Sequence, residues 1–524
     1  MKLRTIVKIA ITSSVVLLCS GFALYSFFRL SAAEGQKDFN LYELVPSTTS
    51  AVFVTDDVLE FVAEVDELTC SKNQQYLYVS KLFSYLKQSL YALSEDTPHG
   101  LSRQMNQMLI SFHEPDNERN QVLYCRLGNG DKELVNRFVR KYISSLYPPK
   151  TFIYKGEEII IYPMADGDFL ACYLTSDFMA LSFQKKLIEN VIDAYKSGKS
   201  LADDSTFTGI RAPKKSAAAA TIYTRMQGMM GWTEFDMKMK DDFIYFSGIT
   251  HDADTCFAFI NQLRQQQSVK GFPGEVLPST AFYFSRQGIT DWVSLLSYGN
   301  AQGQSVPART SEVQNWDKEF SRYLMENAGQ DLVACLFQRE DTLQGAAAVL
   351  SLSVADVTEA ERMLRALVNA ASADEGRRNP RITFCYTVNK AYPIYRLPQT
   401  TLFEQLTSFA EPTLDVYAAF YVGRLLLAPD ADALAHYIRQ LDKGEVLNGA
   451  MVYQTGMDHL SDSYHFMLMA DFDHIFQQSE NHVRFVPDFF LRNADFFRHF
   501  TLFVQFACAD GVVYPNIVLK YKSE

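Results

Sequence analysis

The sequence contains few tryptophans and histidines, and it lacks three short motifs that mark common enzyme classes. It has 3 tryptophans and 9 histidines among 524 residues. A G-x-S-x-G nucleophile elbow, an H-E-x-x-H zinc helix and a C-x-x-C pair are all absent. This excludes the hydrolase, metalloprotease and dithiol enzymes that those motifs define, although 48% hydrophobic residues suffice for a large folded core.

Positive charge is also scarce. The formal net charge is −12, from 49 basic and 61 acidic residues. Residues 1–33 hold four of the basic residues and no acidic one, which leaves 45 basic against 61 acidic residues in the remainder. Because an acidic body repels phosphate backbones, we expect no binding to nucleic acid.

One long run without charge occurs, at residues 9–28. Twenty such residues can cross about 30 Å of hydrocarbon as a helix. Lys2, Arg4 and Lys8 precede the run, and the positive-inside tendency keeps basic flanks in the cytoplasm. We therefore predict a membrane anchor over residues 1–33, with one pass through the inner membrane of a Gram-negative bacterium and the C-terminal body in the periplasm.

Two alternatives to a retained anchor stay open. Ser31-Ala32-Ala33 offers a small-x-small cleavage site, and Cys19 offers a site for lipid attachment. The apolar run is longer than the roughly 7–15 residues of a signal peptide, and Arg29 separates it from the cleavage site. Leu18 stands where a lipobox requires a small residue. Each alternative still exports the body.

The cysteines outside this run are odd in number and widely spaced. A body of roughly 490 residues has enough core to fold without disulfides. We expect buried single thiols, with one incidental bridge left open. These cysteines are Cys70, Cys125, Cys172, Cys256, Cys335, Cys385 and Cys508.

The chain contains an internal repeat. Residues 44–48 (LVPST) recur as residues 276–280 (VLPST), and residues 181–201 match residues 427–447 without a gap. A third match joins Asp131, Arg137 and Arg140 to Asp356, Arg362 and Arg365. Matches in the same order predict a tandem duplication. The fold class is therefore expected to be α+β, with an N-terminal transmembrane helix followed by two tandem, homologous, mainly antiparallel sheet-plus-helix modules at 40–270 and 271–524.

Turn and cap residues place the elements of each module. Gly198 and Gly444 are expected to end equivalent helices, which Ser182 and Asp430 cap at their starts. Asp241-Asp242 and Asp510-Gly511 are expected to form the hairpin turns that close each module.

The repeat also provides a test for catalytic motifs. A motif that occurs in one copy and not in the equivalent place of the other is less easily explained as catalytic. Ser182 and Lys185 fit the S-x-x-K pattern of serine acyl enzymes, but Ala428 and Ala431 replace them in the second copy. A second chance match is Ser84 with Lys87. Gly198-Lys199-Ser200 resembles the end of a phosphate-binding loop but follows a helix instead of preceding one, so we interpret it as a helix end.

Three further patterns have structural explanations. Five histidines fall near the C-terminus, at positions 459, 465, 474, 482 and 499, without the close spacing of a zinc site; we read His465 as facing solvent or a partner from a strand. The acidic pairs Asp203-Asp204, Asp252/Asp254 and Asp430/Asp432 are expected to cap helices and turns. Phe496, Phe500 and Phe503 lie at helical spacing and are expected in the core rather than in a lipid or partner groove.

The chain resembles an uncharacterised family of bacterial membrane-anchored envelope proteins, known as a domain of unknown function with a tandemly repeated α+β module. The resemblance rests on residues 44–54 and 276–284, on the helix end at 198–201 and on the final strand pair around Asp510-Gly511. It implies location and architecture, and it transfers no functional residue.

The sequence therefore predicts a non-catalytic, membrane-anchored periplasmic scaffold or binding protein, with no cofactor. Its expected partners are the membrane, through the N-terminal helix, and envelope proteins. No catalytic, cofactor-binding or metal-binding residue is predicted. Two alternatives are an apolar or peptide ligand bound in a cleft between the modules, and a cryptic hydrolase.

Overall fold

The computed structural model describes most of the chain after residue 38. The described residues are 39–73, 105–113, 119–128, 131–138, 147–164, 167–211, 218–225, 231–250, 258–301, 310–339, 345–374, 382–388, 390–407, 413–478, 486 and 488–522. Outside them lie the predicted anchor with Cys19 and the 31–33 cleavage site, and also Ser84, Lys87, Arg140, Asp252, Asp254, Cys256 and His482. In the described ranges, no helix is long and apolar enough to cross a membrane.

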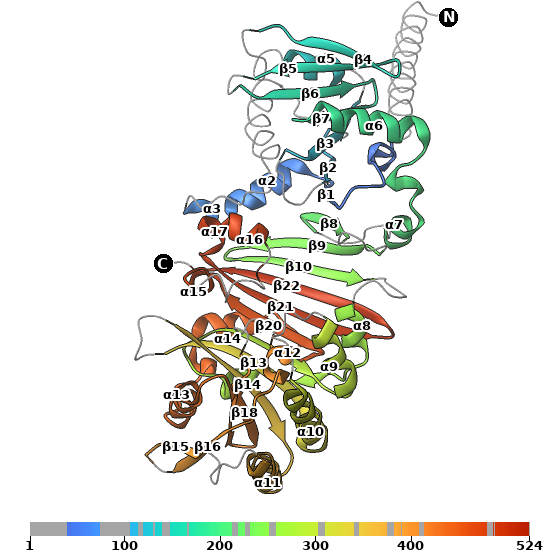
Figure 1. The fold of residues 1–524 in the computed structure, drawn as a ribbon. Helices are drawn as coiled ribbons and strands as arrows, with labels where there is room; N and C mark the ends of the chain where they lie inside the picture. The colour runs from blue at the N-terminus through green and yellow to red at the C-terminus, as the bar shows by residue number, and fades with distance from the viewer. Residues whose placement is uncertain are drawn as a thin grey trace, which may run out of the picture.

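The protein is a mixed helix-and-strand structure built on one large sheet, and Figure 1 shows this sheet running the length of the molecule from β4 to β15 and β16. The elements of the first half are η1 (Leu41–Leu44), β1 (Ala51–Thr55), α2 (Val58–Glu67), α3 (Thr69–Lys72), β2 (Met108–Phe112), β3 (Gln121–Arg126), α5 (Asp131–Phe138), β4 (Lys150–Tyr154), β5 (Glu157–Pro163), β6 (Phe169–Leu174), β7 (Phe178–Ser182), α6 (Lys185–Ser197), η3 (Leu201–Asp203), α7 (Ser205–Ile210), β8 (Ala220–Thr224), β9 (Thr233–Lys240) and β10 (Phe243–Thr250).

The second half repeats much of this series. Its elements are α8 (Ala258–Arg264), β11 (Val269–Lys270), η4 (Pro273–Val276), β12 (Ala281–Gly288), α9 (Trp292–Ala301), α10 (Ser311–Asn327), β13 (Ala328–Gln338), β14 (Ala346–Val354), α11 (Val357–Asp374), β15 (Ile382–Tyr386), β16 (Ala391–Arg396), α12 (Leu402–Leu406), β17 (Tyr417–Tyr421), β18 (Arg424–Ala428), α13 (Ala431–Asp442), η5 (Leu447–Gly449), α14 (Met451–Met457), β19 (Ser463–Tyr464), β20 (Phe466–Asp471), α15 (Phe472–Phe476), α16 (Asp488–Arg492), α17 (Ala494–Phe497), β21 (Phe500–Ala509) and β22 (Val512–Tyr521).

Strand pairing follows one order in both halves. In the first half the order is β10-β9-β8-β1-β2-β3-β7-β6-β5-β4. In the second half it is β22-β21-β20-β12-β13-β14-β18-β17-β16-β15. Every pairing among the described strands is antiparallel, so the predicted class of helices with a mainly antiparallel sheet is confirmed. The predicted module ranges stay a prediction. Two elements that precede residue 271 contact elements that follow it: α8 contacts α9, and β11 pairs with β19.

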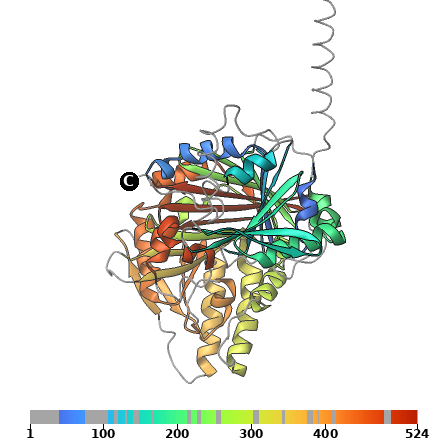
Figure 2. The ribbon, with the colours of Figure 1, turned by 90° about the horizontal axis from the view of Figure 1, so that it is seen from above.

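The two halves join through their last strands. β10 pairs with β22, and Ser247 lies opposite Asn516 at the centre of this pair. Both residues are the fifth of their strand, so the pairing has the same register viewed from either half, as in a two-fold symmetric dimer. Figure 2 shows the strands of the two halves crossing at an angle, as the twist of so many strands requires.

Helix ends and turns follow the predicted residues. Gly198 has φ +63° at the end of α6, and Gly444 has φ +77° just beyond α13. Asp430 caps α13 by accepting a hydrogen bond from the backbone of Asp432. The prediction for Ser182 was wrong: it is the last residue of β7, and Gln184 is the N-cap of α6. The strand continues there because the buried Ser182 hydroxyl donates to the Gln121 carbonyl on β3.

Both predicted hairpin turns are present. β9 and β10 meet at Asp241, with φ +51°, and β21 and β22 meet at Asp510 and Gly511, with φ +52° and +80°. Positive φ at the centre matches the twist of the flanking strands. The turns therefore fix the registers of the strands that meet at the join.

A second pair of contacts ties the start of each half to its helix end. Isolated bridges join Pro46 to Ser200 and Pro278 to Val446. Next to each bridge a backbone amide donates across the same gap, from Leu201 to Val45 at 2.8 Å and from Leu447 to Leu277 at 2.9 Å. The repeated LVPST and VLPST segments thus occupy the same place in both halves.

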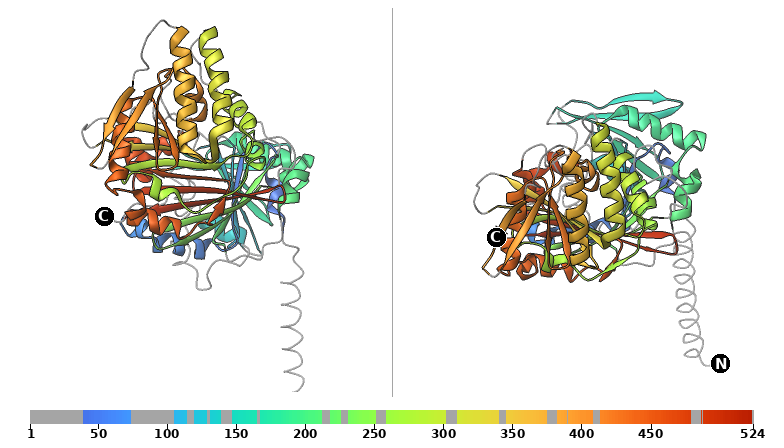
Figure 3. Two further views of the ribbon diagram at one scale, coloured as in Figure 1. Left: turned by 90° about the horizontal axis from the view of Figure 1, so that it is seen from below. Right: turned by 60° about the horizontal axis from the view of Figure 1, so that its bottom comes forward.

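The helices and aromatic side chains complete the core. Figure 3 shows α10 and α11, which contact each other, projecting side by side from the second half. Phe500 and Phe503 are fully buried, which confirms the expected core location. Their helical spacing with Phe496 is incidental, because Phe496 lies on α17 whereas Phe500 and Phe503 lie on the strand β21.

Candidate functional site

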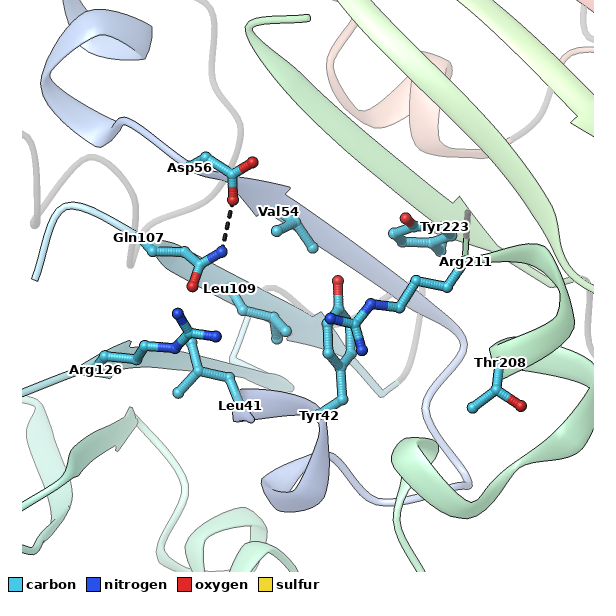
Figure 4. A pocket seen from close by; sticks show the side chains of 10 residues that line it. All are labelled: Leu41, Tyr42, Val54, Asp56, Gln107, Leu109, Arg126, Thr208, Arg211 and Tyr223. Carbon is cyan, nitrogen blue, oxygen red and sulfur yellow. Dashed lines mark hydrogen bonds between the residues drawn. The ribbon is translucent and has the colours of Figure 1, made fainter. Parts of the chain in front are cut away.

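The first half contains a cavity of about 440 Å³ above β1, β2 and β8 (Figure 4). Its walls come from η1, from α7 and the residue after it, and from the strands β1, β2, β3 and β8 with the residues that adjoin β1 and β2. It is lined by Leu41, Tyr42, Val54, Asp56, Gln107, Leu109, Arg126, Thr208, Arg211 and Tyr223. A volume of this size lies within the range of roughly 300–1,000 Å³ typical of small-molecule sites.

Two buried phenol groups face the cavity. Tyr42 is 7% exposed and Tyr223 is 2% exposed, and neither hydroxyl has a hydrogen-bond partner among the described residues. Burial raises the pKa of Tyr42 to about 12, against the opposing effect of Arg211, and burial also raises the pKa of Tyr223. Both hydroxyls are therefore protonated at neutral pH and can donate.

Two guanidinium groups contribute positive charge. The Arg211 guanidinium lies 4.2 Å from the centre of the Tyr42 ring, at the exposed mouth of the cavity, and has no ion pair with a described carboxylate. The Arg126 Nε donates to the Phe39 carbonyl at 2.6 Å. Both arginines lower the pKa of Tyr42, so both act on the space around its hydroxyl.

An amide and a carboxylate form the opposite wall. The Gln107 Nε2 donates to Asp56 Oδ1 at 2.6 Å (Figure 4). This bond fixes the amide and leaves Gln107 Oε1 buried without a partner among the described residues. A buried acceptor without a donor costs about 1–3 kcal/mol, so this wall is suited to a ligand that donates.

The second half has different residues at the same positions. Val54 pairs with Leu109, and Arg286 pairs with Val333 in the equivalent strands. Two positions further on, Gln107 lies beside Asp56 just beyond the paired residues of β1 and β2, and Asp331 lies opposite Gly288 in the last pair of β12 and β13. Arg286 and Asp331 therefore stand where the first half has Val54 and Gln107.

These second-half residues form a satisfied ion network. Arg286 Nε lies 3.0 Å from Asp331 Oδ2, and Arg424 Nη1 lies 3.4 Å from Asp331 Oδ1. Arg286 also donates to the Gly271 carbonyl, at 2.7 Å, and to the Tyr464 hydroxyl, at 3.1 Å. In the second half, Arg286 and Asp331 thus bond to each other at the positions where Val54 and Gln107 line the cavity of the first half.

A second cavity, of about 600 Å³, is a more open groove between α9, α10 and α12. Its one buried carboxylate, Asp317, already accepts hydrogen bonds from the hydroxyls of Thr400 and Thr401, both at 2.6 Å. Among the described residues that line this groove, no buried side-chain donor or acceptor lacks a hydrogen-bond partner, so the cavity of the first half is the better candidate. Neither cavity lies between the halves, and the predicted inter-module cleft stays a prediction.

The chance motifs do not assemble in the described residues. Lys185 pairs with Glu189 at 3.1 Å, whereas the Ser182 hydroxyl is committed to Gln121 at 2.8 Å. Gly198-Lys199-Ser200 is the predicted helix end, and Ser200 forms a capping box with Asp203. Asp204 caps α7, so the prediction that this acidic pair caps helices is confirmed.

The C-terminal histidines contact different partners. His459 lies against Tyr245, His474 lies 3.4 Å from Asp471, and His465 Nδ1 accepts from the backbone of Cys508. His465 is thus half-buried at the bend between β19 and β20 and bonded to β21, so the prediction that it lies within a strand was wrong. In the described ranges, no three metal-ligating side chains come together.

Of the cysteines that the structure describes, Cys70, Cys125, Cys172, Cys335 and Cys385 are buried free thiols and Cys508 is half-buried and free. The prediction of buried single thiols is confirmed for these five. Cys256 lies outside the described ranges.

Comparisons with protein-family models, with curated proteins and with solved structures find no match to this chain. The resemblance to a family of envelope proteins therefore stays an expectation. The geometry of the cavity is the observation from which a function can be argued.

Proposed function

We propose that this chain is a membrane-anchored, non-catalytic binding protein of the bacterial envelope, built from two copies of one α+β module. The first copy carries the ligand site, and the second copy is a scaffold. The anchor is the uncharged run at residues 9–28, and the body lies in the periplasm. The common strand order and the equivalent bridges of Pro46 and Pro278 support the duplication.

One observation carries the binding function. At the positions where the second half has the ion network of Arg286, Asp331 and Arg424, the first half has a cavity with a buried polar atom that lacks a described partner. After duplication, one copy can lose a site and gain stability while the other copy retains the site. Such a loss in the second copy explains why this cavity occurs in the first half.

We expect that filling the cavity abolishes ligand binding and leaves the fold intact. Val54→Trp places an indole in the space above β1, next to Leu109. The full chain in detergent is screened against a library of metabolites by thermal shift, and hits are measured by calorimetry. The expected loss is at least about 100-fold, because the ligand and the ring compete for one volume.

The matched control is Val388→Trp, at a residue that is 94% exposed. It should bind every hit as the wild type does. Equal binding by Val54→Trp and the wild type would place the ligand elsewhere and refute the proposed site.

The anchor is tested separately. Deletion of residues 2–33 should move the protein from the membrane fraction to the cytoplasm, because the remaining chain has no other uncharged run of this length. Fusion of alkaline phosphatase after Glu524 should be active only with the run intact. An active fusion of the deletion variant, or a full chain released from membranes by carbonate, would contradict the anchor.

A further inference from the structure

We propose that the cavity of the first half binds the carboxylate end of an amino acid or short peptide. This inference rests on the proposed binding function and specifies its ligand. The carboxylate lies at the side of Arg211, Tyr42 and Tyr223, and an N–H group of the ligand lies at the side of Gln107. The apolar part of the ligand rests on the strands between these two sides.

The anionic end follows from the donors around Tyr42. The Arg211 guanidinium lies over the Tyr42 ring, 4.2 Å from its centre, and has no ion pair with a described carboxylate, so its N–H groups can donate to a planar acceptor. The Tyr42 and Tyr223 hydroxyls are protonated and have no described partner. A carboxylate can accept from a guanidinium and from two hydroxyls at once, since its oxygens offer about four acceptor sites.

The charge of the lining favours a single negative charge on the ligand. Among the lining residues, Arg126 and Arg211 are positive and Asp56 is negative. The remaining charge of +1 is balanced by one carboxylate, whereas a phosphate monoester of charge near −2 leaves an excess of negative charge. Glu234, which also raises the pKa of Tyr42, adds a further negative charge near the lining and therefore disfavours a doubly charged phosphate still more.

The assignment of an N–H donor to the other end of the ligand is based on Gln107. Its Nε2 is bound to Asp56, which turns the buried and unpartnered Oε1 into the acceptor of this wall. A ligand ammonium or amide N–H satisfies this oxygen, and an ammonium gains in addition from the charge of Asp56. Amino acids and peptides carry such a donor and a carboxylate a few bonds apart.

The body of the ligand is apolar and small. Leu41, Val54 and Leu109 form this part of the lining and are between 1% and 7% exposed. They contribute no polar atom, so a ligand side chain here is aliphatic or aromatic. A cavity of about 440 Å³ suits a dipeptide rather than a long chain.

The test uses dipeptides that end in leucine, valine or phenylalanine, together with their C-terminal amides, their N-acetyl forms and phenyl phosphate. Binding to the full chain in detergent is measured by isothermal calorimetry. At least one free dipeptide should bind, its C-terminal amide should bind about tenfold more weakly, and phenyl phosphate should bind more weakly than the dipeptide. Equal binding of an N-acetyl form would identify the C-terminus of a longer peptide as the source, and weaker binding would identify a free dipeptide or amino acid; both agree with the proposal.

Variants test the assigned ends. Arg211→Gln should weaken the dipeptide about tenfold and leave the C-terminal amide unchanged, because only the acid uses the guanidinium. The matched control Arg362→Gln, at an exposed arginine of α11, should change neither.

Two results would overturn the ligand assignment. One is equal affinity for acids and amides, and the other is the absence of binding by every peptide at millimolar concentration. If Val54→Trp then still lost binding of a hit from the metabolite library, the proposed function would stand and only the peptide assignment would fail.

Discussion

Replacement of Asp331 by alanine is expected to destabilise the protein by about 3–5 kcal/mol. Asp331 is 7% exposed and neutralises Arg286 and Arg424, whose side chains are 15% and 13% exposed. The alanine variant leaves two guanidinium groups close together in the interior, and no other described carboxylate forms an ion pair with either of them. The measurement is the free energy of unfolding of the full chain in detergent, from urea titration followed by tryptophan fluorescence.

The pH dependence separates charge from packing. Burial by itself raises the pKa of Asp331, but Arg424, Ser353 and Arg286 outweigh it, so the pKa of this carboxyl is lowered. A lowered pKa means that Asp331 stabilises the fold above the unfolded value of about 3.9 and that this contribution is lost as pH falls through the folded pKa. The difference between wild type and Asp331→Ala should therefore be constant near neutral pH and shrink below about pH 4.

Two controls accompany this variant. Glu359→Ala removes an exposed ion pair with Arg362 and should leave the unfolding midpoint unchanged. The triple variant R286V/D331Q/R424F installs the first-half residues Val54, Gln107 and Phe178, and should recover most of the loss because no unpaired charge remains. If the triple variant were as unstable as Asp331→Ala, packing rather than charge would explain the network.

Local features of the fold could be predicted from the sequence because local chemistry determines them. Gly198 and Gly444 end helices since a left-handed residue is needed there, and Asp510-Gly511 forms a hairpin turn for the same reason. The repeat was visible where residue types matched without gaps, as in residues 181–201. Ser182 was misplaced as a cap because its hydroxyl bonds across the sheet to Gln121, a partner that local sequence does not reveal.

The candidate site could not be predicted, because its residues come together only through strand register. Arg211 follows α7, Arg126 ends β3 and Tyr42 lies in η1. The informative comparison is Val54 with Arg286 and Gln107 with Asp331, but these pairs are separated by 232 and 224 residues, so an alignment without gaps cannot find both. The register of β1 with β2 and of β12 with β13 shows where the alignment of the two halves needs a gap.

The pairing of β10 with β22 also could not be predicted from the sequence. A proline in this pair of strands is the second substitution with a large expected effect on stability. Ser247→Pro is expected to destabilise the protein by about 3 kcal/mol or more and to divide its unfolding into two transitions. Ser247 lies between Asp236 on β9 and Asn516 on β22, so proline removes a ladder hydrogen bond and its ring collides with a neighbouring strand. The Ser247 side chain is exposed, and the effect is therefore one of the backbone at the join.

Calorimetry of the full chain tests this expectation. The wild type should unfold in one transition, because the halves share a continuous sheet and a core in which Ile244 lies with Leu519 and Tyr521. Ser205→Pro is the matched control, since Ser205 is the first residue of α7, where proline fits the helix and no helical hydrogen bond is lost. A single unshifted transition for Ser247→Pro would mean that the join contributes little, and that each half is stable through its own strands alone.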